Sequence, residues 1–156
     1  MSKPDNIVQT KSYAFAVRIV RLYQHLASEK KEFVLSKQVL RCGTSIGANV
    51  EEAIGGQSRA DFLSKLSIAY KEARETSYWL RLLKDTDYLT DTQFQSIHAD
   101  AEELCRIIGS IQKSTKDNPA PNSPRSPPSS VWSPLGNGSA IPSRVPFLFP
   151  PLGGEG

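Results

Sequence analysis

The sequence predicts an all-α protein, an antiparallel up-down-up-down four-helix bundle followed by a disordered tail. Apolar residues recur every three or four positions through four long segments within residues 6–118. Connections of only a few residues join these segments, which favours antiparallel neighbours. None of the segments alternates apolar and polar residues in the way that a half-buried strand does.

The composition changes abruptly at Pro119. Residues 119–156 hold ten of the eleven prolines and five of the ten glycines, with many serines between them. Such a segment cannot continue a helix and has little periodic apolar surface to bury. We therefore expect one folded domain at residues 1–118 and a disordered Pro/Ser/Gly-rich tail at 119–156.

The first helix is expected from Asn6 to Ser28. Its main apolar row is Phe15, Ile19, Leu22 and Leu26. A second row beside the first is Ala16, Val20, Tyr23 and Ala27. Together the rows cover roughly 160° of the helix surface, whereas a surface helix needs a stripe of about 100°. The excess predicts that the second row packs against something outside the bundle, namely another subunit.

The second helix is expected from Ser36 to Ile54. Gly43 and Gly47 lie four residues apart in its interior, so another helix can approach closely there. Each glycine costs about 1 kcal/mol of helix propensity, and tight packing is the natural compensation. Gly55 and Gly56 are expected to end the helix, because glycine accepts the left-handed conformation of a helix C-cap.

A row of polar residues follows one side of the second helix. Its members, at spacings of four and three, are Gln38, Cys42, Ser45, Asn49 and Glu52. Serine and asparagine compete with the backbone for hydrogen bonds, so a whole row of such residues in a helix requires a reason. Two interpretations stay open: the row is the boundary between core and solvent, or it meets another helix through side-chain hydrogen bonds.

Capping patterns place the last two helices. Ser58 and Asp61 resemble a capping box and open the third helix, which continues to about Asp85. Its core row is Phe62, Leu66, Ala69, Ala73, Thr76, Leu80 and Leu83. Thr90 and Gln93 form a second capping box at the start of the fourth helix. The core row of that helix is Phe94, Ile97, Ala101, Leu104, Ile108 and Ile111.

Two motifs in the second and third helices carry a resemblance. SKQxLRxxTSIxANxxE spans Ser36 to Glu52, and DFxxKLxIAxKEAxETxYWLxLL spans Asp61 to Leu83. On these motifs the chain resembles the four-helix-bundle family of the 23S rRNA intervening-sequence protein. That family also includes the accessory variability determinant proteins of diversity-generating retroelements. One departure is visible, because many relatives have glycine where this chain has Ala53.

The resemblance adds expectations about assembly and partners. It implies a homo-oligomer, most simply a ring of five, that associates with RNA or DNA. It also implies either a role beside a reverse transcriptase or a link to an insert in ribosomal RNA. Family membership by itself implies no activity.

Catalytic and metal-binding patterns are missing from the sequence. His98 and Glu102 lie four apart, but a di-iron bundle would need Glu-x-x-His, and position 95 is glutamine. There is no phosphate-binding glycine loop and no nucleophile beside a base. Cys42 and Cys105 have neither a zinc nor a redox spacing. We expect a non-enzyme without catalytic residues, metal or cofactor.

The N-terminus and hydropathy point to the cytoplasm. Residues 1–10 have neither the charged start nor the apolar run of a signal peptide. No apolar stretch approaches the length that a bilayer span requires. We therefore expect a cytoplasmic protein with no membrane partner.

Basic residues concentrate in the first forty positions. The first helix carries no acidic residue between Lys11 and Ser28, whereas the fourth helix carries Asp91, Asp100, Glu102 and Glu103. Such a basic face is suited to phosphates. Its candidate members are Lys11, Arg18, Arg21, Lys30, Lys31, Lys37, Arg41, Arg74 and Arg81.

Two functions from different classes therefore stay open. In the first, the protein is an oligomeric accessory factor that binds RNA or DNA through this basic face. In the second, it is an assembly module with protein partners only, and the basic face complements the acidic fourth helix of the same or a neighbouring subunit.

Overall fold

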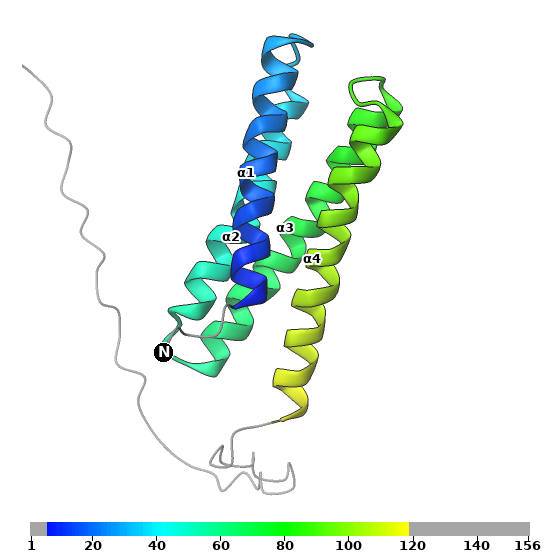
Figure 1. Ribbon diagram of the computed structural model, residues 1–156. Helices are drawn as coiled ribbons and strands as arrows, with labels where there is room; N and C mark the ends of the chain where they lie inside the picture. The colour runs from blue at the N-terminus through cyan, green and yellow to red at the C-terminus, as the bar shows by residue number, and fades with distance from the viewer. Residues whose placement is uncertain (1–5, 119–156) are drawn as a thin grey trace, which may run out of the picture. The chain divides into compact units, whose positions relative to one another are not determined.

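Four antiparallel α-helices make up the part of the chain that the computed structural model describes, residues 6–118 (Figure 1). They are α1 Ile7–Ser28, α2 Leu35–Ile54, α3 Arg59–Asp85 and α4 Asp91–Asp117. These residues contain no strand. The predicted four-helix bundle is confirmed, and each helix begins within one residue of its expected start. The predicted disordered tail at 119–156 lies outside the described residues.

The helix starts form largely as the capping patterns predict. The Gln93 N–H donates to Thr90 Oγ1 over 3.2 Å, and the Thr90 N–H donates to Gln93 Oε1 over 3.0 Å, which completes the predicted capping box of α4. At α3, Ser58 Oγ accepts the Asp61 N–H over 3.1 Å. Only this half of the predicted box forms there, since aspartate is one methylene shorter than the usual glutamate.

The core runs along the bundle through the predicted apolar rows. Its largest fully buried side chains are Phe15, Ile19, Leu26, Ile46, Leu66, Leu80, Leu83, Leu104 and Ile108. Leu22, Phe62, Phe94 and Ile111 were predicted in the core rows but are only partly buried at its edge. These side chains lie near helix ends or on the α1–α4 side, where fewer neighbours cover them.

The two helix-interior glycines bring α1 and α2 together. A Cβ at Gly43 would lie 2.8 Å from Ile19 Cγ1, and a Cβ at Gly47 would lie 3.3 Å from the Ser12 backbone oxygen. Any side chain at either position would hold the two helices further apart. The predicted close approach is therefore confirmed, and its partner is α1. The predicted left-handed cap is wrong: α2 does end at Ile54, but Gly55 has φ = −81°.

The helix α1 packs closely on α2 but much less closely on α4. Figure 1 shows α1 and α4 separating toward the end where α1 finishes and α4 begins. Side chains that would be buried in a closed bundle are left half-buried there, among them Leu22 and His25. This open end of the bundle lies beside the connection between α1 and α2.

Candidate nucleic-acid interface

A firmly held turn connects α1 to α2. Lys31 adopts φ = 54°, a left-handed conformation that is uncommon for lysine. The next residue, Glu32, is only 7% exposed, and its N–H donates to the Leu26 carbonyl over 3.0 Å. The Glu32 carboxylate accepts the backbone N–H groups of Val34, Leu35 and Ser36 over 3.0, 2.8 and 2.7 Å. Glu32 thereby satisfies the free N–H groups at the start of α2.

These hydrogen bonds decide the ionisation of Glu32. Burial acts to raise the pKa of the Glu32 carboxyl, but the hydrogen bonds from Ser36, Leu35 and Val34 outweigh it and hold the pKa below its usual value. The side chain is therefore a carboxylate at neutral pH. The dipole of α2 also favours a negative charge at the N-terminus of the helix.

The turn presents lysines and apolar side chains to solvent. We call residues 30–37 the α1–α2 tip. Lys30, Lys31 and Lys37 are all exposed, and none has an ion pair within residues 6–118. Phe33 is 50% exposed and Val34 is 71% exposed. The tip therefore combines three free positive charges with an accessible aromatic ring.

Three other members of the predicted basic face already form ion pairs with acidic residues of the same subunit. Lys11 Nζ donates to Glu103 Oε2 over 3.0 Å, and Arg18 pairs with Asp100. Arg41 pairs with Glu75 on α3. These side chains are roughly two-fifths exposed or more, so each pair is worth only about 0–1 kcal/mol.

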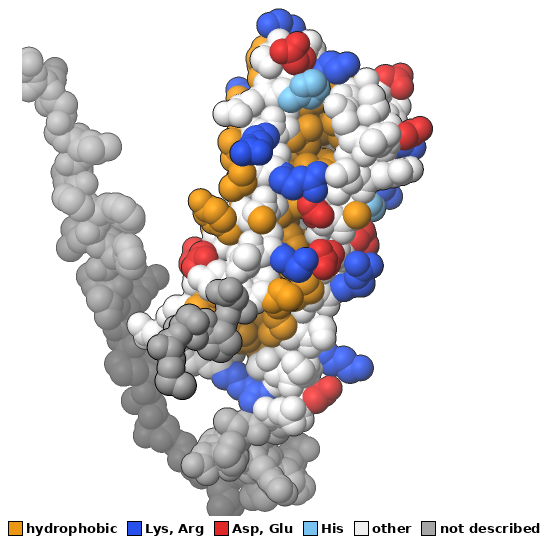
Figure 2. Space-filling model, viewed as in Figure 1, with side chains coloured by type: hydrophobic (Ala, Val, Ile, Leu, Met, Phe, Trp, Pro, Cys, Tyr) orange, Lys and Arg blue, Asp and Glu red, His pale blue; other side chains and the backbone are white. Residues whose placement is uncertain are grey.

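The remaining members, Arg21, Arg74 and Arg81, are exposed and have no ion pair among the described residues. In Figure 2, Lys and Arg side chains are spread over the visible face, with acidic side chains among them in both its upper and its lower part. The structure thus divides the predicted set. Six cations are free to meet a ligand, and three complement acidic residues of the same subunit.

The polar row of α2 serves several local purposes. Asn49 Nδ2 donates to Ser45 O over 2.9 Å and lies 3.1 Å from Ser45 Oγ, so these two residues bond within their own helix. Cys42 Sγ lies 3.2 Å from Thr76 Oγ1, and Glu52 pairs with Lys65, which joins the row to α3. Gln38 is half-buried at the same edge. Both interpretations of the row therefore describe part of it.

The predicted oligomer row of α1 lies at the surface of the bundle. Val20 is 38% exposed, whereas Ala16, Tyr23 and Ala27 are half-buried. The adjacent Tyr13 and Val17 are 70% and 37% exposed, so the exposed apolar surface of α1 extends beyond the predicted row. The row predicted from the sequence did not include Tyr13 and Val17.

One cluster has the residue types of a hydrolase but the wrong geometry. Ser77 Oγ lies 2.8 Å from His98 Nε2 and 3.1 Å from Glu102 Oε1. In a catalytic triad the acid holds the second imidazole nitrogen, whereas Glu102 lies 3.7 Å from the same Nε2 that meets the serine. The cluster is a hydrogen-bonded contact between α3 and α4.

The cysteines are buried thiols. Burial raises the pKa of the Cys42 thiol to about 11 and also raises that of Cys105, so neither is a reactive thiolate at neutral pH. Within residues 6–118, no group of three or more His, Cys, Asp or Glu side chains is placed to hold a metal ion. No helix in this range is long and apolar enough to cross a membrane.

Sequence reasoning missed Glu32, which organises the tip. Acidic residues just before a helix are common, so nothing in the sequence distinguishes one that is buried against three N–H groups. The exposure of Phe33 could not be predicted from the sequence either. An aromatic residue in a short connection is as consistent with packing on the core as with facing solvent.

Comparisons with known proteins agree with this fold. A crystal structure of a protein of unknown function from the S23 ribosomal protein family of Bacteroides thetaiotaomicron is similar to this chain, with 59% sequence identity and a TM-score of 0.69. The match covers 70% of this chain and 97% of that one. None of the curated proteins matches the chain. The sequence model of the 23S rRNA-intervening sequence protein family matches residues 4–110. The chain therefore belongs to the 23S rRNA-intervening sequence protein family.

Proposed function

We propose that this protein is a non-enzymatic, oligomeric nucleic-acid-binding protein whose primary contact is the α1–α2 tip. The observation that carries the proposal is the set of three unpaired lysines, Lys30, Lys31 and Lys37, on a turn held by Glu32. The family description, which refers to 23S rRNA, favours RNA as the ligand. Lys11, Arg18 and Arg41 contribute less, because a phosphate would first have to compete with their carboxylate partners.

A preformed tip favours binding for two reasons. Phosphate contacts supply most non-specific affinity by releasing counterions from the nucleic acid. Lysines on an ordered turn keep their spacing, so binding loses less conformational freedom than it would for lysines on a mobile loop. Phe33 offers one base-stacking surface beside them. We therefore expect mainly backbone contacts and weak sequence preference.

Charge reversal at the tip tests the proposal. In a titration of structured RNA, the double variant Lys30→Glu, Lys31→Glu should bind weakly. Its slope of log affinity against log salt should be smaller by about two, roughly one for each lost phosphate contact. The matched control is Lys113→Glu, Lys116→Glu at the opposite end of α4, where both lysines are exposed. Equal affinities and slopes for the two double variants would refute a role for the tip.

Self-association is the second part of the proposal. An exposed apolar row on one helix of a small bundle, here Tyr13, Val17 and Val20, is the kind of surface that subunit contacts cover. Covering it in a ring, which the family resemblance suggests would have five subunits, would repeat the tip around an axis. Several weak phosphate contacts would then act together on one strand.

A pair of matched substitutions tests self-association. Val20 and Ile68 are 38% and 39% exposed but lie on different helices. Val20→Glu should give smaller species than wild type in light scattering, because a charge would be buried between subunits. Ile68→Glu should leave the wild-type size unchanged. A wild-type protein that is monomeric at micromolar concentration would contradict the oligomer.

The protein-only assembly module is the competing function, and the ion pairs of Lys11 and Arg18 with α4 favour it. It predicts no RNA or DNA binding even at low salt. The genomic neighbourhood separates the cellular roles: a reverse-transcriptase gene with its template repeat, or an insert in a ribosomal RNA gene.

A further inference from the structure

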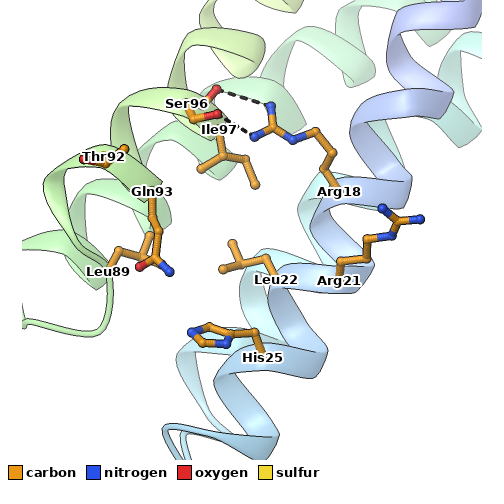
Figure 3. A pocket seen from close by; sticks show the side chains of 9 residues that line it. All are labelled: Arg18, Arg21, Leu22, His25, Leu89, Thr92, Gln93, Ser96 and Ile97. Atoms are coloured by element: carbon orange, nitrogen blue, oxygen red, sulfur yellow. Dashed lines mark hydrogen bonds between the residues drawn. The ribbon is translucent and has the colours of Figure 1, made fainter.

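A cavity of about 490 Å³ opens between α1 and α4 at the end of the bundle where these helices diverge. Figure 3 shows Leu22 and His25 pointing from α1 toward Leu89 and Gln93, with Arg21 at the rim. Small-ligand sites commonly enclose about 300–1,000 Å³. The cavity therefore has the size of a site for one small molecule or one monomer unit of a polymer.

The floor of the cavity is apolar and its edge is basic. Leu89 and Ile97 are 4% and 6% exposed, and with Leu22 they form the apolar lining. Arg18 and Arg21 line the edge, and no Asp or Glu is among the lining residues. In Figure 3 the guanidinium of Arg21 points away from the floor, toward the outside. A ligand with an apolar plane and a negative charge at one end complements this arrangement.

Two further polar groups on the walls lack partners of their own. His25 Nε2 is buried and makes no hydrogen bond with any described residue. Within residues 6–118, the other such buried atom is Glu72 Oε2, which has Arg41 Nη1 3.8 Å away, so His25 is the less compensated of the two. A buried polar atom without a partner is unfavourable, and a ligand that bonded to it would remove that cost. Gln93 uses Oε1 to accept from Thr90, which leaves its Nε2 group as a donor.

We infer that this cavity binds a single unstacked nucleotide. The base would lie on Leu22, Leu89 and Ile97 and bond to the Gln93 amide. His25 Nε2 would join it after a rotation of the half-buried ring. The phosphate would meet Arg21 once this exposed side chain turns toward the cavity. Inorganic phosphate would leave the apolar floor in contact with water, and a fatty acid would leave His25 and Gln93 unsatisfied. A ligand with an aromatic, hydrogen-bonding ring and an anionic group such as phosphate uses all three parts of the lining.

The position of the cavity connects it to the proposed function, on which this inference rests. His25 precedes Lys30 by five residues, and the cavity and the α1–α2 tip lie at the same end of the bundle. A strand held at the tip would have its next nucleotides beside the cavity. The inferred specificity is therefore for RNA that contains unpaired nucleotides. A free nucleoside monophosphate is the alternative ligand, because it carries the same base and phosphate.

The test compares two RNAs and one free nucleotide. The RNAs are a hairpin with a single-stranded loop and a blunt duplex with the same stem, and the free nucleotide is adenosine monophosphate. Wild type should bind the hairpin about tenfold more tightly than the duplex, the effect of one stacked base. His25→Phe should abolish this preference, leave duplex binding unchanged, and keep or raise the melting temperature, because it removes an unsatisfied polar atom.

A second variant blocks the cavity without altering the core. Thr92 is exposed and lines the cavity, so Thr92→Trp should also abolish the hairpin preference. Gln95→Trp, at an exposed position on the same helix that does not line the cavity, should retain it. Arg21→Gln should weaken hairpin binding. Its control is Arg106→Gln, which also removes an exposed positive charge but from α4.

The outcomes separate the two hypotheses. If both RNAs bind but His25→Phe and Thr92→Trp keep the hairpin preference, the cavity inference is wrong and the tip proposal stands. If adenosine monophosphate binds wild type but neither cavity variant, and no RNA binds, the cavity inference holds and the tip proposal fails. Binding of neither RNA nor the nucleotide overturns both. If both variants lose the hairpin preference and wild type does not bind adenosine monophosphate, the cavity binds a nucleotide only as part of an RNA strand.

Discussion

Replacing Gly43 with alanine will destabilise the bundle, although alanine is the better helix former. The added Cβ would lie 2.8 and 2.9 Å from Cγ1 and Cγ2 of Ile19. Ile19 is 0% exposed, and these atoms are near the base of a branched side chain, so the core leaves them little room to move. Overpacking costs about 1–3 kcal/mol, against a gain of up to about 1 kcal/mol in helix propensity. We expect a net loss of about 1–2 kcal/mol, and a larger one for Gly43→Val.

Chemical denaturation with a double-mutant cycle measures the contact itself. Ile19→Ala alone should cost about 2–5 kcal/mol, because it leaves a cavity. The double variant Gly43→Ala, Ile19→Ala should lose at least about 1 kcal/mol less than the sum of the single losses, since the new methyl group fills that space. Gly109→Ala is the matched control, because its Cβ would meet only Tyr70 at 3.7 Å and should be neutral or stabilising. Additive losses at positions 19 and 43 would rule out direct packing.

Glu32→Ala will give the second large loss, about 2 kcal/mol or more. It removes the acceptor of three backbone N–H groups at the start of α2. A hydrogen bond to a charged group contributes about 1.5–3 kcal/mol net, and water that enters in place of the carboxylate restores part of the total. Glu29→Ala, in the same connection but exposed, should change the free energy of unfolding by less than about 0.5 kcal/mol.

The loss at Glu32 should depend on pH in one direction. The folded-state pKa of Glu32 lies below its ordinary value of 4.5, so the carboxylate stabilises the folded state fully above that pH. The stabilisation disappears as the pH falls from 4.5 through the folded-state pKa. The difference in free energy of unfolding between wild type and Glu32→Ala should therefore shrink across that range. A difference that stays constant from neutral pH to pH 3 would show that the charge of Glu32 is irrelevant.

The helices could be predicted because their signals are local. Apolar spacing located the core faces, and Thr90 with Gln93 marked the start of α4. Gly43 and Gly47 indicated a close contact, but their spacing could not say that the partner is α1. That information depends on the rotation of each helix, which packing of the whole bundle determines.

The candidate site was less predictable because charge in a sequence does not reveal its partners. Arg18 and Arg21 have the same residue type and lie on the same helix, yet only Arg18 reaches a carboxylate, Asp100. The cavity beside them depends on how far α1 and α4 diverge, which no periodicity encodes. His25 could be placed on the first helix, but its unsatisfied Nε2 could not be foreseen.

Ultraviolet crosslinking of the full chain to structured RNA, followed by mass spectrometry of the crosslinked peptides, tests most directly where nucleic acid binds. We expect crosslinks to concentrate in the α1–α2 tip, with Phe33 prominent because its half-exposed ring can stack on a base. They should weaken together as salt is raised from about 50 to 200 mM, as phosphate contacts do. Absence of crosslinks at low salt, or crosslinks concentrated at the opposite end of α4 around Lys113 and Lys116, would contradict the account.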